Sequence, residues 1–169
     1  MRQNSISRKS VLMKIVNENP GIRFNEIMRM SGIRNGSLSH HIKKLNEEGL
    51  ITVEITPRIT RIYPIGISSV EAKLCRILSK ETQRRIILFI LEKEVVTSQQ
   101  IRDHIKKSSS VVSVNLTELF KQNIIEKQYD IPSNKYSLKN TEQVKGVLKE
   151  YYPNLREKMT ENIIEMLNF

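Results

Sequence analysis

The stretch LSHHIKKLNEEGLI, residues 38–51, contains the pattern that decides the fold of this chain. Its apolar side chains recur at spacings of four and three residues, which places them on one side of a helix: Leu38, Ile42 and Leu45. Gly49 follows the last helical positions, where glycine is a common helix stop. Residues 50–56 are rich in β-branched side chains, as strands are. The pattern therefore predicts a helix over residues 35–48 that leads into a β-strand.

The flanking residues complete one structural unit. The predicted elements, in order, are helices over residues 8–17, 25–30 and 35–48 and strands over residues 50–56 and 61–63. Turn-forming residues separate the helices, at Asn19-Pro20-Gly21 and Ser31-Gly32-Ile33. Asn35 is expected to cap the third helix. The sequence thus predicts three helices followed by a two-stranded hairpin.

The same apolar pattern occurs twice along the chain. Residues 8–56 align without a gap to residues 82–130, at an offset of 74. The apolar positions coincide: Leu12 with Ile86, Ile15 with Phe89, Ile27 with Ile101, Leu38 with Val112, Ile42 with Leu116 and Leu45 with Leu119. Repeated apolar spacing implies two copies of one supersecondary unit, each with its own core. The second copy is expected to contain helices over residues 80–92 and 109–122, a helix opening at the capping-box sequence Thr97-Ser98-Gln99-Gln100, and strands over residues 125–129 and 135–138.

The order helix, short helix, turn, long helix and two-stranded hairpin is that of a winged helix-turn-helix. Residues 8–66 resemble the ArsR/MarR superfamily of DNA-binding regulators. The residues that match its signature Ser-x-His-Leu-x-x-Leu-x-x-x-Gly-Leu-(Ile/Val) are Ser39-His40-His41-Ile42, Leu45 and Gly49-Leu50-Ile51. Those that resemble its wing are Arg58, Arg61 and Tyr63. The second copy departs from the signature at Asn115 and Asn123, and the pair together resembles a tandem winged-helix regulator of the archaeal type.

The repeat and the resemblance predict a mainly α fold with small β-hairpin wings. The expected organisation is a DNA-reading winged helix-turn-helix domain over residues 1–68, a linker helix over 69–79, a second such domain over 80–139 and C-terminal helices over 140–169. Ser69 is expected to cap the linker helix. The C-terminal helices, expected over residues 141–151 and 153–167, carry apolar stripes. These stripes fit either packing onto the second domain or the seam of a homodimer.

The composition points to a polyanionic partner. The 169 residues include 28 Lys plus Arg and 18 Asp plus Glu, a formal net charge of +10, which favours nucleic acid over a membrane surface. No apolar run approaches the ~20 residues of a membrane helix, and no apolar signal core follows the N-terminus, so a cytoplasmic protein is expected. The sequence has no phosphate loop, paired-carboxylate motif or activated nucleophile, and its one cysteine and three histidines form no metal-ligand spacing. We therefore expect no enzyme activity and no cofactor or metal.

The side of the third helix opposite its apolar residues suits the major groove of DNA. His40 can donate a hydrogen bond to guanine, and Lys43 and Lys44 can reach phosphates or a guanine edge. The wing arginines could enter the flanking minor groove or bind phosphate. The predicted DNA-binding residues are Asn35, Gly36, Ser37, Ser39, His40, His41, Lys43, Lys44, Arg58 and Arg61. For His41, which lies at the edge of the buried side, a structural role is the stronger alternative.

The second copy lacks cations at the outward positions of its third helix, which are Ser110, Val111, Val114, Thr117 and Glu118. Its two exposed valines could touch thymine methyl groups, but an apolar patch more often contacts protein. The second copy is therefore expected to dock on protein or to add only phosphate contacts. The leading interpretation is a sequence-specific regulator of transcription that binds double-stranded DNA. The alternative is a winged-helix protein-interaction subunit of a transcription or chromatin assembly. Cys75 is expected to be buried or half-buried in the linker helix, and His104 is expected to lie on a helix surface.

Overall fold

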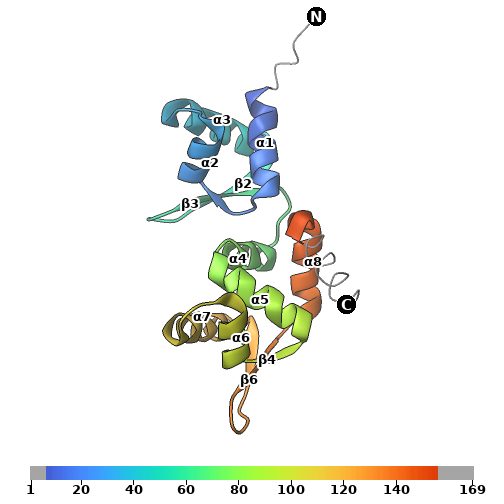
Figure 1. The fold of residues 1–169 in the computed structure, drawn as a ribbon. Coiled ribbons are helices and arrows are strands. Elements are labelled where there is room, and N and C mark those ends of the chain that lie inside the picture. The colour runs from blue at the N-terminus through green and yellow to red at the C-terminus, as the bar shows by residue number, and fades with distance from the viewer. Residues whose placement is uncertain (1–6, 156–169) are drawn as a thin grey trace, which may run out of the picture. The chain divides into compact units, whose positions relative to one another are not determined.

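The computed structural model describes residues 7–155 and divides into two compact units. The first unit comprises Met1–Ser79 and Val147–Phe169, and the second comprises Lys80–Gly146. Each unit is mainly helical with a small antiparallel sheet, which confirms the predicted fold class (Figure 1). None of the described helices is both long and apolar enough to cross a membrane.

Four helices and a three-stranded sheet form residues 8–78 of the first unit. Its elements are α1 (Arg8–Glu18), β1 (Ile22–Arg23), α2 (Phe24–Ser31), α3 (Asn35–Glu47), β2 (Ile51–Ile55), β3 (Thr60–Pro64) and α4 (Ser69–Leu78). The strands are antiparallel in the order β1-β3-β2. The predicted two-stranded hairpin is present, but the prediction missed a third strand, β1, in which Ile22 pairs with Ile62. A strand of two residues is too short to show periodicity in the sequence.

The helix ends differ from the prediction at two caps. Arg34, not Asn35, is the N-cap of α3, because Asn35 already belongs to the helix while Arg34 is extended. Ser68, not Ser69, caps α4: its hydroxyl accepts a hydrogen bond from the Glu71 N–H, and the Glu71 carboxylate accepts one from the Ser68 N–H. This reciprocal pair is a capping box. Gly49, at φ +67°, follows the end of α3 as predicted.

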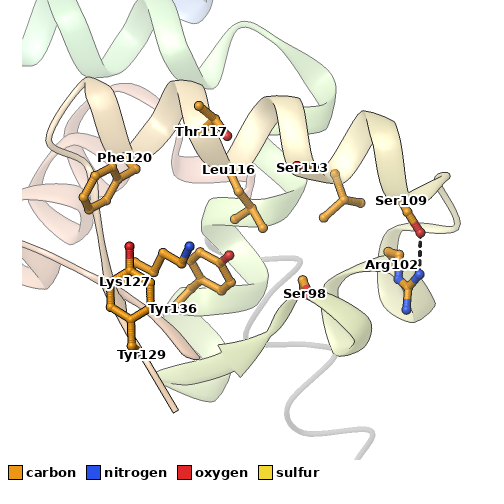
Figure 2. A pocket seen from close by; sticks show the side chains of 11 residues that line it. Ser98, Arg102, Ser109, Ser113, Leu116, Thr117, Phe120, Lys127, Tyr129 and Tyr136 are labelled. Atoms are coloured by element: carbon orange, nitrogen blue, oxygen red, sulfur yellow. Dashed lines mark hydrogen bonds between the residues drawn. The ribbon is translucent and has the colours of Figure 1, made fainter. Parts of the chain in front are cut away.

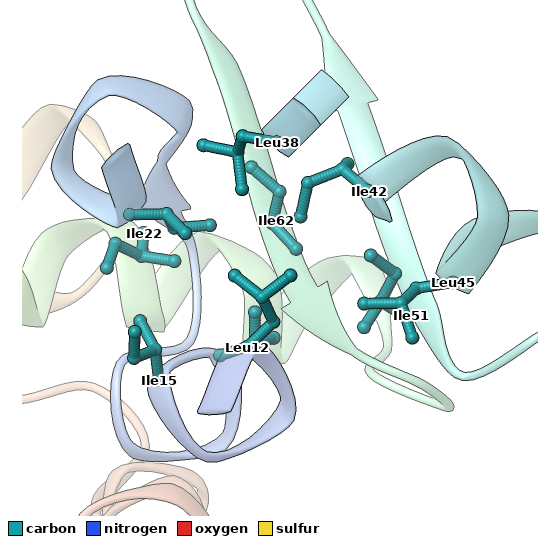
Figure 3. Close-up of a cluster of buried hydrophobic side chains, with 10 residues drawn as sticks. Leu12, Ile15, Ile22, Leu38, Ile42, Leu45, Ile51 and Ile62 are labelled. Carbon is teal, nitrogen blue, oxygen red and sulfur yellow. The ribbon is translucent and has the colours of Figure 1, made fainter. Parts of the chain in front are cut away.

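The core of the first unit lies between its helices and its sheet (Figure 3). Ten buried side chains form it: Leu12, Ile15, Val16, Ile22, Ile27, Leu38, Ile42, Leu45, Ile51 and Ile62. The three apolar residues of α3 that predicted this helix are all among them. Their burial sets the rotation of α3 about its axis, so the opposite side of the helix faces solvent.

The second unit repeats the element order at the predicted offset of 74. Its elements are α5 (Glu81–Lys93), β4 (Val95–Thr97), α6 (Ser98–Ile105), α7 (Ser109–Lys121), β5 (Ile125–Gln128) and β6 (Lys135–Leu138). Its sheet order, β4-β6-β5, matches that of the first unit, and so does its register: Val96 pairs with Tyr136. Thr97 and Gln100 form the predicted capping box. Asn123 stands at the place of Gly49 with φ +66°, a conformation that asparagine visits more readily than most residues.

Helix α8 (Thr141–Tyr151) has the bounds predicted for the first C-terminal helix. Its apolar residues Val144, Val147 and Leu148 are buried within the chain, which favours intramolecular packing for this helix. The second predicted C-terminal helix, over residues 153–167, lies mostly outside the described residues. Most of the apolar stripe assigned to a homodimer seam lies there with it.

Candidate nucleic-acid interface

Helix α3 presents a polar and cationic side to solvent. The predicted DNA-binding residues that are exposed on it are Asn35, Gly36, Ser39, His40, Lys43 and Lys44, and those that are half-buried are Ser37 and His41. The His41 ring meets the His40 ring edge-on, with centroids 6.0 Å apart. The structure thus brings these residues together on one element, because the burial of Leu38, Ile42 and Leu45 turns them outward.

Each lysine of this side is paired with a glutamate one turn later. Lys43 Nζ lies 3.8 Å from Glu47 Oε1. Lys44 Nζ lies 3.9 Å from Glu48 Oε1. Lys9 of α1 also binds Glu48, at 2.6 Å, and this hydrogen bond is the main cause that lowers the pKa of the Glu48 carboxyl. Exposed ion pairs of this kind contribute little to stability, so a phosphate can replace the carboxylates at small cost.

A hollow beside the start of α3 gathers two arginines. It has a volume of about 440 Å³ and is lined by Arg8, Val11, Ser31, Gly32, Ile33, Arg34 and Ser37. Two guanidinium groups and two hydroxyls beside the first turn of a helix are groups that can bind a phosphate. The sequence prediction missed Arg8 and Arg34 because it considered only the outward side of the third helix. The signal available for both was a cation at the beginning of a predicted helix.

The two wing arginines have different surroundings. Arg58 is exposed in the turn between β2 and β3, where the Thr56 hydroxyl accepts a hydrogen bond from the Ile59 N–H at 3.1 Å. Arg61 lies within β3, is half-buried, and donates from Nη1 to the Gly21 carbonyl at 2.8 Å. Arg61 therefore holds the turn before β1 against the sheet, whereas Arg58 points its charge to solvent.

Tyr63 belongs to the interior and not to the surface of the wing. Its side chain is 2% exposed, and its hydroxyl donates to Glu54 Oε2 at 2.9 Å. Burial, followed by the contact with Glu54, raises the pKa of Tyr63 to about 12. Tyr63 thus lies in the predicted wing, on β3, but its side chain faces the interior, on the side where Arg76 of α4 pairs with Glu54 at 2.6 Å.

Residues 6–74, which include α1 to β3, match a family model described as HTH_HVO_0163_N, an N-terminal HTH domain. The first unit contains a helix-turn-helix domain. A comparison with curated proteins gave no significant match.

Several solved structures are similar to parts of this chain. The transcriptional repressor BigR from Xylella fastidiosa is 20% identical, over 47% of this chain and 81% of its own, with a TM-score of 0.43. A MepR-like protein is 12% identical, over 79% of this chain and 86% of its own, with a TM-score of 0.40. ZitR, a zinc-responsive MarR family member from Lactococcus lactis, is 22% identical, over 78% of this chain and 79% of its own, with a TM-score of 0.35.

Helix α7 has the place that α3 has in the helix-turn-helix domain, but the outward positions predicted for it carry no cation. Val114 is 66% exposed. Glu118 binds Lys80 at 2.5 Å. Asn115, at the position of His41, donates from Nδ2 to the Val111 carbonyl at 2.8 Å. The two helices therefore present surfaces of different chemistry within the same frame.

Cys75 and His104, which lie outside the helix-turn-helix interface, pack against other parts of the protein. Cys75 is fully buried in α4, and burial raises the pKa of its thiol to about 12, which confirms the predicted placement. His104 is exposed on α6, where its ring stacks on Phe89 with centroids 4.0 Å apart, and partial burial lowers its pKa. Within the part of the chain that the structure describes, His, Cys, Asp and Glu form no group of three that could hold a metal ion.

Proposed function

We propose that this chain is a sequence-specific regulator of transcription that binds double-stranded DNA. The observation that carries the proposal is the exposed cationic side of α3 within a helix-turn-helix domain. In such domains the second helix of the motif enters the major groove and reads base edges. The protein, once bound to its DNA site, then blocks or recruits the polymerase.

Helix α3 offers both kinds of contact that sequence reading requires. Gly36 and Ser37 in its first turn allow close approach to base edges, and His40 one turn later donates to a guanine acceptor. Lys43 and Lys44 then bind phosphates and release the glutamates with which they pair. Asn35 and Ser39, joined by a hydrogen bond of 3.4 Å, lie on the adjoining flank, where they contact the DNA backbone. In this proposal His41 orients its neighbour and reads no base.

Cations beside α3 supply the remaining contacts with the DNA backbone. The hollow that contains Arg8 and Arg34 receives a phosphate next to the first turn of α3. Arg58, exposed at the tip of the hairpin, reaches the flanking minor groove or its phosphates. Arg61 keeps the hairpin in place through the Gly21 carbonyl and contacts DNA only through its remaining donors.

A titration of duplex DNA at two salt concentrations tests the proposal. Each phosphate that a lysine or arginine neutralises should make log K fall by ~0.9 per decade of salt. We expect a steep slope for the full chain and a selected cognate sequence from a random pool. A flat salt response, or no binding at ~50 mM salt, would overturn the DNA function.

The exposed valines and the lack of cations on the outward side of α7 favour a second role, protein interaction, for the second unit. Val114 and Val111 are exposed there, and Glu118 is already bound to Lys80. We propose that this surface contacts the transcription machinery or another protein and that it does not read DNA. A homodimer through the C-terminal helices is the related proposal, since a two-fold dimer suits operators with two half-sites.

A further inference from the structure

A groove of about 470 Å³ lies in the second unit between α6, α7 and the β5–β6 hairpin (Figure 2). It runs along one flank of α7, from Ser109 at the start of the helix to Phe120 near its end. Neither the predicted DNA contacts nor the exposed valines of α7 account for it. Its volume falls within the range of small-molecule sites, ~300–1,000 Å³.

At four positions that correspond to groove residues of the second unit, the first unit has apolar side chains. At the offset of 74, the four groove residues Ser98, Arg102, Lys127 and Tyr136 stand where the first unit has Phe24, Met28, Val53 and Ile62. The first three of those apolar residues pack against the core of the first unit, and Ile62 is buried within it. The strand register is the same in both units, since Val53 pairs with Ile62 and Lys127 with Tyr136. At these four positions the shared frame is therefore packed with apolar side chains in the first unit, whereas the second unit has polar side chains that line a groove.

One end of the groove is suited to an anion. The guanidinium of Arg102 is half-buried and donates to the Ser109 hydroxyl, which fixes its orientation (Figure 2). A guanidinium has five N–H donors, so several remain for a ligand. The described residues that line the groove include two cations, Arg102 and Lys127, and no Asp or Glu. A planar, oriented guanidinium in such a setting favours phosphate or carboxylate.

The other end of the groove is aromatic. Phe120 is 51% exposed and Tyr129 is 82% exposed, and Tyr136 lies beside them on β6. Lys127 places its ammonium 4.7 Å from the centroid of the Tyr129 ring. Exposed aromatic faces next to a cation bind flat, polar rings by stacking. Between the two ends, the hydroxyls of Ser113 and Thr117 line the groove along α7.

We propose that this groove binds a nucleoside monophosphate. The base stacks on Phe120 and Tyr129, the phosphate binds Arg102 and Ser109, and the sugar hydroxyls meet the serine and threonine hydroxyls between them. This order of aromatic, hydroxylated and anionic groups is the order of parts in a nucleotide. The site belongs to the second unit alone, so it goes beyond the proposed reading of DNA by α3 and does not depend on it.

Calorimetric titration of the full chain with the four common nucleoside 5′-monophosphates, without DNA, tests the site. At least one should bind with a Kd below about 1 mM. Its nucleoside and inorganic phosphate, each lacking one half of the ligand, should bind at least ~10-fold more weakly, because each ΔΔG of ~1.4 kcal/mol is tenfold. Failure of all four nucleotides to bind would overturn the proposal. Binding of a ten-thymidine single strand in place of any mononucleotide would overturn it as well.

Substitutions that convert the groove to the residues of the first unit give the sharpest variant. Ser98→Phe, Arg102→Met, Lys127→Val and Tyr136→Ile together restore an apolar set that the same frame already accommodates, so we expect a folded protein that binds nucleotide at least ~10-fold more weakly. Arg102→Met alone should reproduce the loss. The matched controls are Lys121→Met, which removes an exposed cation of α7 outside the groove, and Ile131→Ala, at the exposed tip of the second hairpin.

Both controls should bind nucleotide as the wild type does, and all variants should bind duplex DNA unchanged. Nucleotide binding that survives the fourfold variant would overturn the proposal, whatever the outcome for DNA. Failure of the wild type to bind duplex DNA would overturn the proposed DNA function but would not affect the proposal of the nucleotide site.

Discussion

Glu54 and Arg76 form an ion pair, with 2.6 Å between Oε1 and Nη1, that joins strand β2 to helix α4 in the first unit. The other oxygen of the same carboxylate accepts the hydrogen bond from the Tyr63 hydroxyl. Both oxygens of Glu54 thus have partners within the first unit. The hairpin that carries Arg58 is thereby tied to the helix that follows it.

Tyr63 should make the stability of the protein fall between about pH 10 and pH 12. Its pKa is raised from 10.0 to about 12, first by burial and then by Glu54. The unfolded chain loses this proton near pH 10 and the folded chain near pH 12, so the contribution is fully present below pH 10 and is lost above it. We expect the free energy of unfolding of the wild type to fall by about 2 kcal/mol over this range because of Tyr63, and we expect this part of the fall to be absent in Tyr63→Phe. Thermal unfolding temperatures measured against pH decide this, with Tyr129→Phe, at an exposed tyrosine, as the control. Parallel curves for wild type and Tyr63→Phe would contradict it.

Gly21→Ala should destabilise the first unit more than Gly66→Ala does. Both glycines have positive φ, +79° and +82°, so both substitutions strain the backbone. A Cβ at Gly21 would also lie 2.8 Å from Cε1 of the buried Tyr63, whereas a Cβ at Gly66 meets nothing within 4 Å. We expect an additional cost of about 1–3 kcal/mol for Gly21→Ala from overpacking. Urea unfolding of the two variants measures it, and equal losses would show that Tyr63 moves aside freely.

Cys75 should be unreactive in the folded protein. Its side chain is fully buried in α4, and burial raises the thiol pKa to about 12. Because the thiolate is the reactive form, a thiol reagent at pH 8 should label the native chain only as fast as it unfolds. The guanidinium-denatured chain, which exposes the thiol, is the control. Rapid stoichiometric labelling of the native chain would place Cys75 at an accessible surface.

His40, Lys44 and Val114 should separate base reading, phosphate binding and protein contact. His40→Ala should cost roughly 1–3 kcal/mol on the cognate duplex and relax preference at one base pair. Lys44→Ala should weaken all sequences alike and reduce the salt slope by about one unit. Val114→Ala should leave DNA affinity nearly unchanged, because in the proposed function this exposed valine contacts protein and not DNA.

Cognate and scrambled duplexes titrated with each variant make the comparison. Lys14→Ala is the matched control for Lys44→Ala, since Lys14 forms an equivalent ion pair with Glu18 at 3.9 Å on α1. A variant pattern in which Val114→Ala loses sequence preference and His40→Ala keeps it would assign the reading role to α7.

The helices were predictable from the sequence because the spacing of their apolar residues is local. Leu38, Ile42 and Leu45 define the buried side of α3 wherever the rest of the chain lies, and Gly49 marks its end. The offset of 74 predicted the second unit for the same reason. Strand β1 was not predictable, because two residues carry no periodicity and Ile22 becomes a strand only by pairing with Ile62 of β3.

The sequence by itself determined the repeated frame of the chain and the composition of the outward side of α3. Apolar periodicity is read within a few turns, and the residues opposite a buried stripe must face solvent. Only the tertiary structure decided the environments of Arg61 and Tyr63, because each depends on a partner from another segment. Arg61 binds the Gly21 carbonyl, and Tyr63 binds Glu54, which in turn pairs with Arg76. It alone also decided the groove beside α7. That groove exists because side chains from α6, α7 and the hairpin, separated in sequence, leave a space where the first unit packs apolar ones.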